Sequence, residues 1–215
     1  MTLAADLYFS FRSPYSYLAI GRYRAMAEEY DLDIKLRPVW PLAVRQPDFF
    51  ERNHPNWLRY TLLDVVRVAE SEGIAFGAPQ PDPIIQDMTT RRIAEEQPYI
   101  RRITRLGQAA ARRGKGLGFA HEAARLIWGG AENWHAGDHL TEAAGRAGLD
   151  FAELEAEAEN DADALDAEIA ANQQALEDAG HWGVPTLVFD GEPFFGQDRI
   201  ALAEWRMKQK GLERR

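Results

Sequence analysis

The stretch Asp6-Leu7-Tyr8-Phe9-Ser10-Phe11-Arg12-Ser13-Pro14-Tyr15-Ser16-Tyr17-Leu18 joins a short apolar run to the signals of a helix start. The aromatic residues of the run are those of a buried strand, and the run is too short to be a helix. Ser13 fits the N-cap of the following helix, and Pro14 fits its first position, where proline's missing N–H costs nothing. The stretch therefore predicts a strand, a turn and a helix that carries a hydroxyl at its positive end.

Two further patterns complete a first structural unit. Apolar residues recur at helical spacing after Pro14, and we expect this helix to end near Tyr30. Polar and apolar residues then alternate over 31–40, where Ile34 and Leu36 fit one face of a second strand. A strand, a helix and a strand with short joints form a βαβ unit, whose right-handed crossover makes the two strands parallel. The order of elements indicates an α/β protein.

The C-terminal segment returns to strands. The run Gly183–Phe189 predicts a strand with Pro185 near its start. The pair Asp190-Gly191 favours a two-residue hairpin turn into a strand at Glu192–Phe195. A last helix is predicted from about Gln197 to Gln209.

Between these segments, residues 44–179 show helical patterns and no convincing strand. The segment Val44–Pro55 is polar and irregular and indicates a loop, and a helical pattern then runs to Gly73. The region from Thr89 to Arg113 predicts a helix pair with solvated basic faces, through arginines 91, 92, 101, 102, 105, 112 and 113. The acidic residues from Glu153 to Glu168 likewise predict a solvated face, and neither set needs a function.

Composition excludes several classes of site. The 215 residues carry a formal net charge of −9, which disfavours nucleic-acid binding. Because there is no cysteine, disulfides, zinc–thiolate sites and cysteine nucleophiles are excluded. His135 and His139 have the spacing of a metal pair, but Gly137 and Asp138 interrupt the helix that would present them, so we expect no metal site. With no secretory signal pattern and no membrane-spanning run, we expect a cytoplasmic protein.

Three motifs, in this order, carry a resemblance to a known family. They are Phe11-Arg12-Ser13-Pro14-Tyr15-Ser16-Tyr17-Leu18, Gly183-Val184-Pro185-Thr186 and Phe195-Gly196-Gln197-Asp198-Arg199. The chain resembles the family of 2-hydroxychromene-2-carboxylate isomerases and kappa-class glutathione transferases, which are relatives of the DsbA oxidoreductases. The resemblance implies an α/β, thioredoxin-like fold with a large helical insertion. Residues 1–43 and 180–215 would form the thioredoxin-like domain, and residues 44–179 the inserted helical domain.

The resemblance also implies a glutathione site. Ser13 would be the catalytic residue, bonded to the glutathione sulfur, since serine stands where the DsbA relatives carry the first cysteine of a redox pair. Pro185 would be cis, and the backbone of Val184 would bind the cysteinyl unit. Gln197 and Asp198, at the start of the last helix, would hold the γ-glutamyl end. Without this resemblance Ser13 is a plain helix cap, Pro185 a strand-edge proline and Asp198 a capping acid.

One position departs from the family pattern. Family members carry a lysine shortly before the tyrosine that matches Tyr60, whereas this chain has Trp57. The contact to the glycyl carboxylate of glutathione therefore falls to Asn53, Arg52 or Arg59, with Asn53 taken as the cofactor-binding residue.

The resulting hypothesis is a glutathione-dependent isomerase of aromatic catabolism. A kappa-like transferase that conjugates electrophiles is the nearest alternative, and a non-catalytic thioredoxin-like binding module is a more distant one. We expect glutathione as cofactor, a small aromatic or electrophilic substrate and a homodimer, with no nucleic-acid or membrane partner. Arg12 is a conjectural ligand for a substrate carboxylate, and Tyr15 and Tyr17 are either core residues or substrate wall.

Overall fold

A computed structural model describes residues 2–87, 89–90 and 92–215. In this part of the chain one four-stranded sheet has the order β2-β1-β3-β4. The strands are β1 (Leu3–Phe9), β2 (Leu32–Pro38), β3 (Thr186–Phe189) and β4 (Glu192–Phe195). The helices are α1 (Pro14–Glu29), α2 (Leu42–Arg45), α3 (Phe49–Arg52), α4 (Pro55–Glu72), α5 (Pro98–Arg112), α6 (Gly116–Trp128), α7 (His139–Arg146), α8 (Phe151–Asn160), α9 (Ala162–Asp178) and α10 (Ile200–Gln209).

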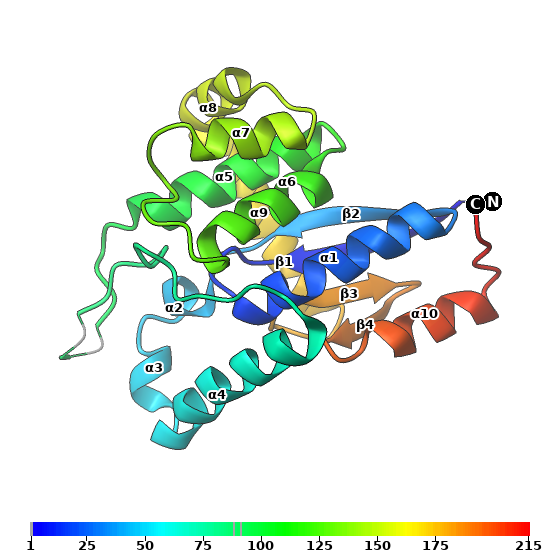
Figure 1. Cartoon of the computed structure of the whole chain (residues 1–215), viewed down its shortest axis with the longest axis horizontal. Coiled ribbons are helices and arrows are strands. Elements are labelled where there is room, and N and C mark those ends of the chain that lie inside the picture. The colour runs from blue at the N-terminus through cyan, green and yellow to red at the C-terminus, as the bar shows by residue number, and fades with distance from the viewer. Residues whose placement is uncertain (1, 88, 91) are drawn as a thin grey trace.

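The sheet is built around β1, which pairs in parallel with β2 and antiparallel with β3. Successive side chains of a strand point to opposite faces. Leu7 and Phe9 accordingly belong to the main core with Leu18 of α1, whereas Tyr8 packs with Leu176 of α9. In Figure 1, α1 and α10 lie in front of the sheet, and α9 passes behind it. The predicted βαβ unit and the thioredoxin-like plan are confirmed.

Several element boundaries follow from local conformation. Helix α4 ends at Gly73 in the left-handed region (φ 64°), as the sequence predicts. Asp190 and Gly191 both have positive φ, 52° and 77°, which suits the predicted two-residue hairpin. The prediction of a loop over 44–55 is wrong, because α2 and α3 form there; helices of four residues are too short to show a helical period.

The helices of the insertion pack directly on the thioredoxin-like elements. Gly107 of α5 lies so close to Phe11 and Pro38 that a Cβ on Gly107 would come within 2.6 Å of the Phe11 ring. Trp128 of α6 donates its Nε1–H to the carbonyl of Phe11 at 3.0 Å. One buried cluster of apolar side chains runs through both parts of the chain. The division into 1–43 with 180–215 and 44–179 stays a prediction.

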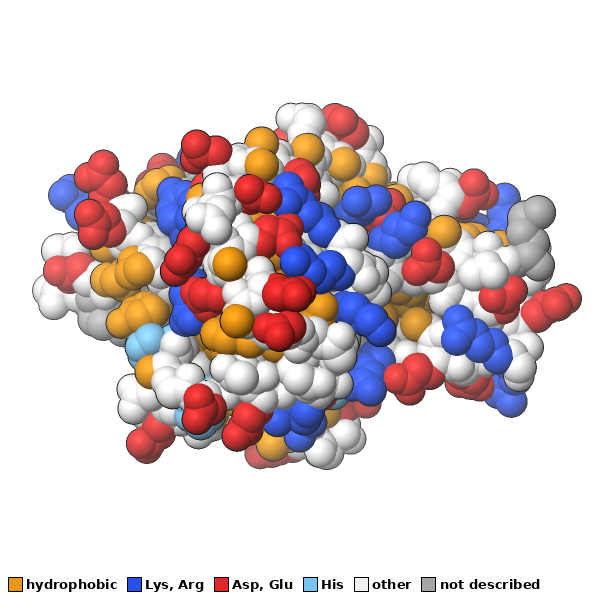
Figure 2. Space-filling view, turned by 90° about the horizontal axis from the view of Figure 1, so that it is seen from above, with side chains coloured by type: hydrophobic (Ala, Val, Ile, Leu, Met, Phe, Trp, Pro, Cys, Tyr) orange, Lys and Arg blue, Asp and Glu red, His pale blue; other side chains and the backbone are white. Residues whose placement is uncertain are grey.

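The arginines of α5, and Arg113 directly after it, pair with acidic residues of α8 and α9. The pairs are Arg102–Glu155 (2.6 Å), Arg105–Asp166 (2.7 Å), Arg112–Glu168 (2.6 Å), Arg112–Glu157 (2.7 Å) and Arg113–Glu157. Figure 2 shows both signs of charge interspersed on the face seen from above. The two predicted solvated faces therefore cover each other only in part: Arg105 and Asp166 are half-buried by their pairing, whereas Arg113 and Glu153 are exposed to solvent. The predicted helix pair is one helix, α5; residues 89–90 and 92–97 contain no helix, and position 91 lies outside the described residues.

This network makes a prediction for acid stability. Hydrogen bonds from Arg112 lower the pKa of Glu168, against burial, which raises it. A carboxyl whose pKa is lowered by folding stabilises the protein above its unfolded pKa, about 4.3, and this stability is lost as the pH falls through the lower folded value. Arg112→Gln should therefore cost about 1 kcal/mol at pH 7, since the groups are partly exposed, and less at pH 3. Urea unfolding at both pH values measures this.

The matched control is Arg67→Gln, which removes an exposed arginine of α4. Equal loss of stability in the two variants at pH 7 would contradict a stabilising role for the network.

Among the helices of the described residues, none has the length and apolar character needed to cross a bilayer.

Candidate active site at the start of helix α1

Ser13 is the N-cap of α1, as predicted. Its Oγ accepts a hydrogen bond from the N–H of Ser16 at 3.2 Å, and the hydroxyl donates to the carbonyl of Val184 at 3.4 Å. The first contact is a helix cap, which also places the oxygen at the positive end of a helix of 16 residues. The second contact is long for an O–H···O bond and is therefore weak. The hydroxyl of Ser16 itself is fully buried and makes no hydrogen bond within the described residues, so it has no access to a ligand.

The structure brings the three sequence motifs together. The Val184–Pro185 peptide is cis, as the resemblance implies, and its Val184 carbonyl faces Ser13. The carbonyl of Pro185 accepts a hydrogen bond from the N–H of Gly196 at 2.9 Å. Gly196 has φ 104° and stands where a Cβ would meet Asp198 Oδ1 at 2.6 Å, so glycine is needed for this turn. The turn is thus fixed to the proline loop, and the loop to Ser13.

Gln197 and Asp198 lie in this turn, before α10. Because α10 begins at Ile200 with Arg199 as its N-cap residue, the predicted start at Gln197 is wrong, and Asp198 does not cap the helix. The Oε1 atom of Gln197 accepts a hydrogen bond from Arg22 at 2.6 Å. The carboxylate of Asp198 is 59% exposed and pairs with Arg199 at 2.8 Å. Both residues directly follow Gly196, whose N–H binds the carbonyl of Pro185, and their binding of glutathione stays a prediction.

The other residues of the opening motif are engaged within the protein. Arg12 forms a two-pronged ion pair with Asp82, through Nε at 3.1 Å and Nη2 at 2.8 Å, which weakens its case as a substrate ligand. Tyr17 is a core residue whose hydroxyl donates to the carbonyl of Ala75. Tyr15 is half-buried and donates to Asp64 at 2.7 Å; burial and this hydrogen bond raise the pKa of Tyr15, so its hydroxyl stays protonated.

Asn53 lies at the end of α3. It is the C-cap of α3 and donates from Nδ2 to the carbonyl of Phe49 at 2.6 Å. Asn53 and Arg52 line an open hollow of about 370 Å³ together with Trp182, two residues before Val184. Sequence reasoning missed Trp182, although its place just before the Gly183-Val184-Pro185 motif was a usable signal.

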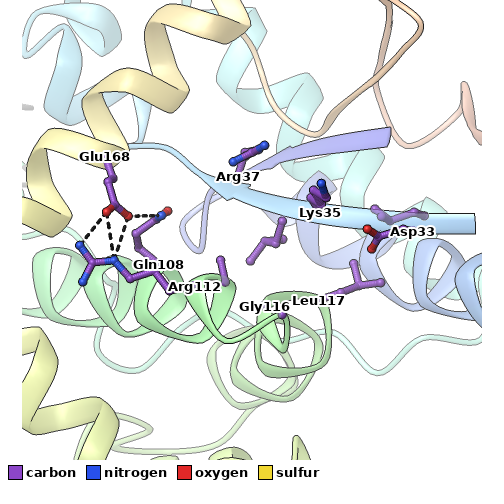
Figure 3. A pocket seen from close by; sticks show the side chains of 12 residues that line it. Asp33, Lys35, Arg37, Gln108, Arg112, Gly116, Leu117 and Glu168 are labelled. Atoms are coloured by element: carbon purple, nitrogen blue, oxygen red, sulfur yellow. Dashed lines mark hydrogen bonds and ion pairs between the residues drawn. The ribbon is translucent and has the colours of Figure 1, made fainter. Parts of the chain in front are cut away.

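A second hollow, of about 350 Å³, lies along β2, beside α5 and the start of α6 (Figure 3). Its polar groups include a cluster in which Glu168 accepts hydrogen bonds from Arg112 and from Gln108 at 2.7 Å. These groups satisfy one another, and the residues of the three motifs do not line this hollow. We assign it no function.

Among the described residues, no cluster of three histidine or acidic side chains is arranged to hold a metal ion. The ring of His135 packs on Tyr99 with centroids 4.6 Å apart, and His139 is half-buried at the start of α7. His181 stacks on Phe195 with centroids 4.0 Å apart and accepts the N–H of Gly183 at 2.9 Å.

Comparisons with solved structures find the same fold. A 2-hydroxychromene-2-carboxylate isomerase is 22% identical with a TM-score of 0.66, over 96% of this chain and 95% of that one. The cytosolic disulfide reductase DsbM from Pseudomonas aeruginosa is 19% identical with a TM-score of 0.60, over 96% and 100%. Its structure with GSH matches at 19% and 0.59, also over 96% and 100%. None of the curated proteins matches in sequence.

The absence of cysteine separates this chain from dithiol–disulfide exchange, which needs two thiols of the protein's own. The fold and the position of Ser13 are nevertheless those of the predicted thioredoxin-like plan. A family model described as a DsbA-like thioredoxin domain matches residues 4–208. The chain therefore belongs to the DsbA-like thioredoxin domain family.

Proposed function

We propose that this protein is a glutathione-dependent isomerase that acts on a 2-hydroxychromene-2-carboxylate-like substrate in aromatic catabolism. The observation that carries the proposal is the Ser13 hydroxyl, which lies at the start of α1 and against Val184 in a chain without cysteine. A thiol used at this position must come from a cofactor. Similarity in fold to a 2-hydroxychromene-2-carboxylate isomerase and to a reductase solved with GSH supports glutathione as that cofactor.

The residues present fit glutathione. Ser13 would exchange its weak contact to the carbonyl of Val184 for a hydrogen bond to the sulfur. The backbone of Val184 would bind the cysteinyl unit in the manner of an added strand. The exposed carboxylate of Asp198 suits the ammonium of the γ-glutamyl end, and the side-chain amide of Gln197 can donate to its carboxylate. Asn53 would meet the glycyl end.

In this proposal the residues of the chain position glutathione, and the thiol of glutathione carries out the reaction. When bound, glutathione would supply the thiol. The thiol adds to the substrate to open its ring, a bond of the opened substrate can then rotate, and the thiol leaves again. Ser13 and the N-terminus of α1 stabilise negative charge on sulfur. Ser13 is not itself the nucleophile, because its hydroxyl contacts a backbone N–H and a carbonyl rather than a histidine.

Calorimetric titration with glutathione tests the proposal, followed by assays with 2-hydroxychromene-2-carboxylate and with 1-chloro-2,4-dinitrobenzene. We expect binding, and turnover of the chromene. Conjugation of the chlorobenzene without isomerisation would favour the kappa-like transferase. If the protein does not bind glutathione at millimolar concentration, both enzyme hypotheses are wrong and the non-catalytic binding module is the remaining one.

The proposal includes a homodimer. Leu58 and Leu62 of α4 share a helical stripe with the buried Val65 and Ala69, yet both are exposed, Leu62 by 59%. A second copy of the chain that covers this face would explain them. Light scattering should give twice the chain mass of 24.3 kDa, whereas a mass of one chain would contradict the dimer.

A cytoplasmic location, in line with the cytosolic reductase of the same fold, is also part of the proposal.

A further inference from the structure

The hollow beside Trp182 has the size of a small-ligand site. It occupies about 370 Å³ between α3 and the segment that leads into Pro185, and its lining comprises Gln46, Phe49, Arg52, Asn53 and Trp182. Ligand sites of proteins typically measure 300–1,000 Å³ and combine aromatic walls with a few polar groups. This hollow has both: two aromatic rings, one guanidinium and two amides.

The Trp182 wall is held in place from behind. Arg45 donates to the carbonyl of Trp182 at 2.9 Å and to the carbonyl of Trp40 at 2.9 Å. The Arg45 side chain is only 7% exposed, and burial lowers its pKa, against the nearby Glu177, which raises it. A buried guanidinium that bridges two backbone carbonyls fixes the segment before Pro185 relative to the end of β2.

The Trp182 ring is also stacked from one side. The rings of His181 and Trp182 are nearly parallel, at 13° with centroids 5.6 Å apart, and His181 in turn stacks on Phe195 at 4.0 Å. Gly183 makes room for this stack, because a Cβ there would lie 2.7 Å from the Phe195 ring. Trp182 is nevertheless 52% exposed. A fixed aromatic ring with so much exposed surface is a stacking platform for another flat ring.

The opposite side of the hollow supplies a cation. Arg52 is 63% exposed, and its Nη2 pairs with Asp48 at 2.8 Å one helical turn away. Such an exposed pair contributes little stability, and a guanidinium carries five donors, so Arg52 can bind a carboxylate at the cost of a weak contact. The amide of Asn53, by contrast, already donates to the carbonyl of Phe49.

The geometry points to this hollow as the binding site of a flat aromatic carboxylate, with its ring stacked on Trp182 and its carboxylate on Arg52. One wall of the site, Trp182, is two residues along the chain from Val184, whose carbonyl accepts the hydrogen bond from Ser13 at the proposed thiol position. This inference rests on the proposed function, because it gives the aromatic substrate its place. It assigns Arg52 to the substrate rather than to the glycyl end of glutathione.

Calorimetric titrations of the full chain with 2-naphthoate and, separately, with glutathione test the assignment. We expect Trp182→Leu and Arg52→Gln each to weaken 2-naphthoate binding about tenfold or more, since stacking and charge-assisted hydrogen bonds are each lost. Glutathione affinity should change less than twofold. The uncharged naphthalene-2-carboxamide should bind the wild type as weakly as 2-naphthoate binds Arg52→Gln.

The matched controls are Trp205→Leu and Arg67→Gln, which remove an exposed tryptophan of α10 and an exposed arginine of α4. Both should bind 2-naphthoate like the wild type, and circular dichroism checks that every variant folds. Unchanged naphthoate binding in Trp182→Leu would overturn the assignment. Loss of glutathione binding in Arg52→Gln with intact naphthoate binding would overturn it too, because Arg52 would then bind the glycyl carboxylate of glutathione rather than the aromatic carboxylate. Naphthoate binding without any glutathione binding would instead sink the proposed function and support the aromatic site.

Discussion

Replacing Ser13 with alanine is expected to lower the ratio of thiolate to thiol in bound glutathione at pH 7 by roughly 10–100-fold. A hydrogen bond to a charged group contributes about 1.5–3 kcal/mol, and about 1.4 kcal/mol corresponds to one pKa unit. Removal of the Ser13 hydroxyl disfavours the charged sulfur, so the pKa of the bound thiol rises. A pH titration of the thiolate absorbance of the complex measures the change.

The controls separate this effect from loss of the helix cap. Ser13→Ala also removes the cap of α1, at a cost of about 0.5–2 kcal/mol in stability. Asp150→Ala removes a comparable cap from α8, where Asp150 accepts the N–H groups of Ala152 and Glu153. Asp150→Ala should lose stability and leave the thiol pKa unchanged, and Ser13→Thr should keep both properties. An unchanged thiol pKa in Ser13→Ala would reduce Ser13 to a structural cap.

Gly107→Ala is expected to destabilise the protein by about 1–3 kcal/mol, although alanine is the better helix former. The new Cβ would lie 2.6 Å from Cε2 of Phe11, which is fully buried. Phe11 cannot easily yield, since its carbonyl accepts a hydrogen bond from Trp128. Any movement of Phe11 also displaces the turn that carries Ser13, so glutathione affinity should fall as well. Urea unfolding and calorimetry measure the two effects.

Gly145→Ala provides the comparison. Gly145 lies within α7, and a Cβ there meets nothing within 4 Å. This variant should gain about 0.5–1 kcal/mol, as glycine does when replaced by alanine in a helix interior. If Gly107→Ala proves as stable as Gly145→Ala, the close contact between α5 and Phe11 is not tight in solution.

Local sequence signals were sufficient to predict several of the helix ends and the hairpin turn. Ser13 and Pro14 mark a helix start whose cap needs only residues three positions apart. Gly73 ends α4, and Asp190-Gly191 turns the hairpin, because both places require positive φ. These features depend on neighbours in the chain, so a single sequence carries them.

Other features depended on contacts that no local pattern records. The pairing of Arg112 with Glu168 joins two helices that are separate in sequence, and each stripe by itself looks like a solvated face. The short helices α2 and α3 are fixed by packing rather than by periodicity. Gln197 and Asp198 lie before the last helix, not in it, because Gly196 turns the chain with φ 104° and is tied to Pro185.

The sequence by itself determined the order of strands and helices, the exclusion of the protein's own thiol chemistry and the serine at the start of α1, since each follows from residue identity and short-range order. The thioredoxin-like plan followed from that order together with the resemblance carried by the three motifs. Only the tertiary structure placed that serine against Val184 and formed the hollow between Trp182 and Arg52. The physical reason is distance along the chain. Contacts between residues more than a hundred positions apart form only when β1 and β3 pair in the sheet and the intervening helices pack around it.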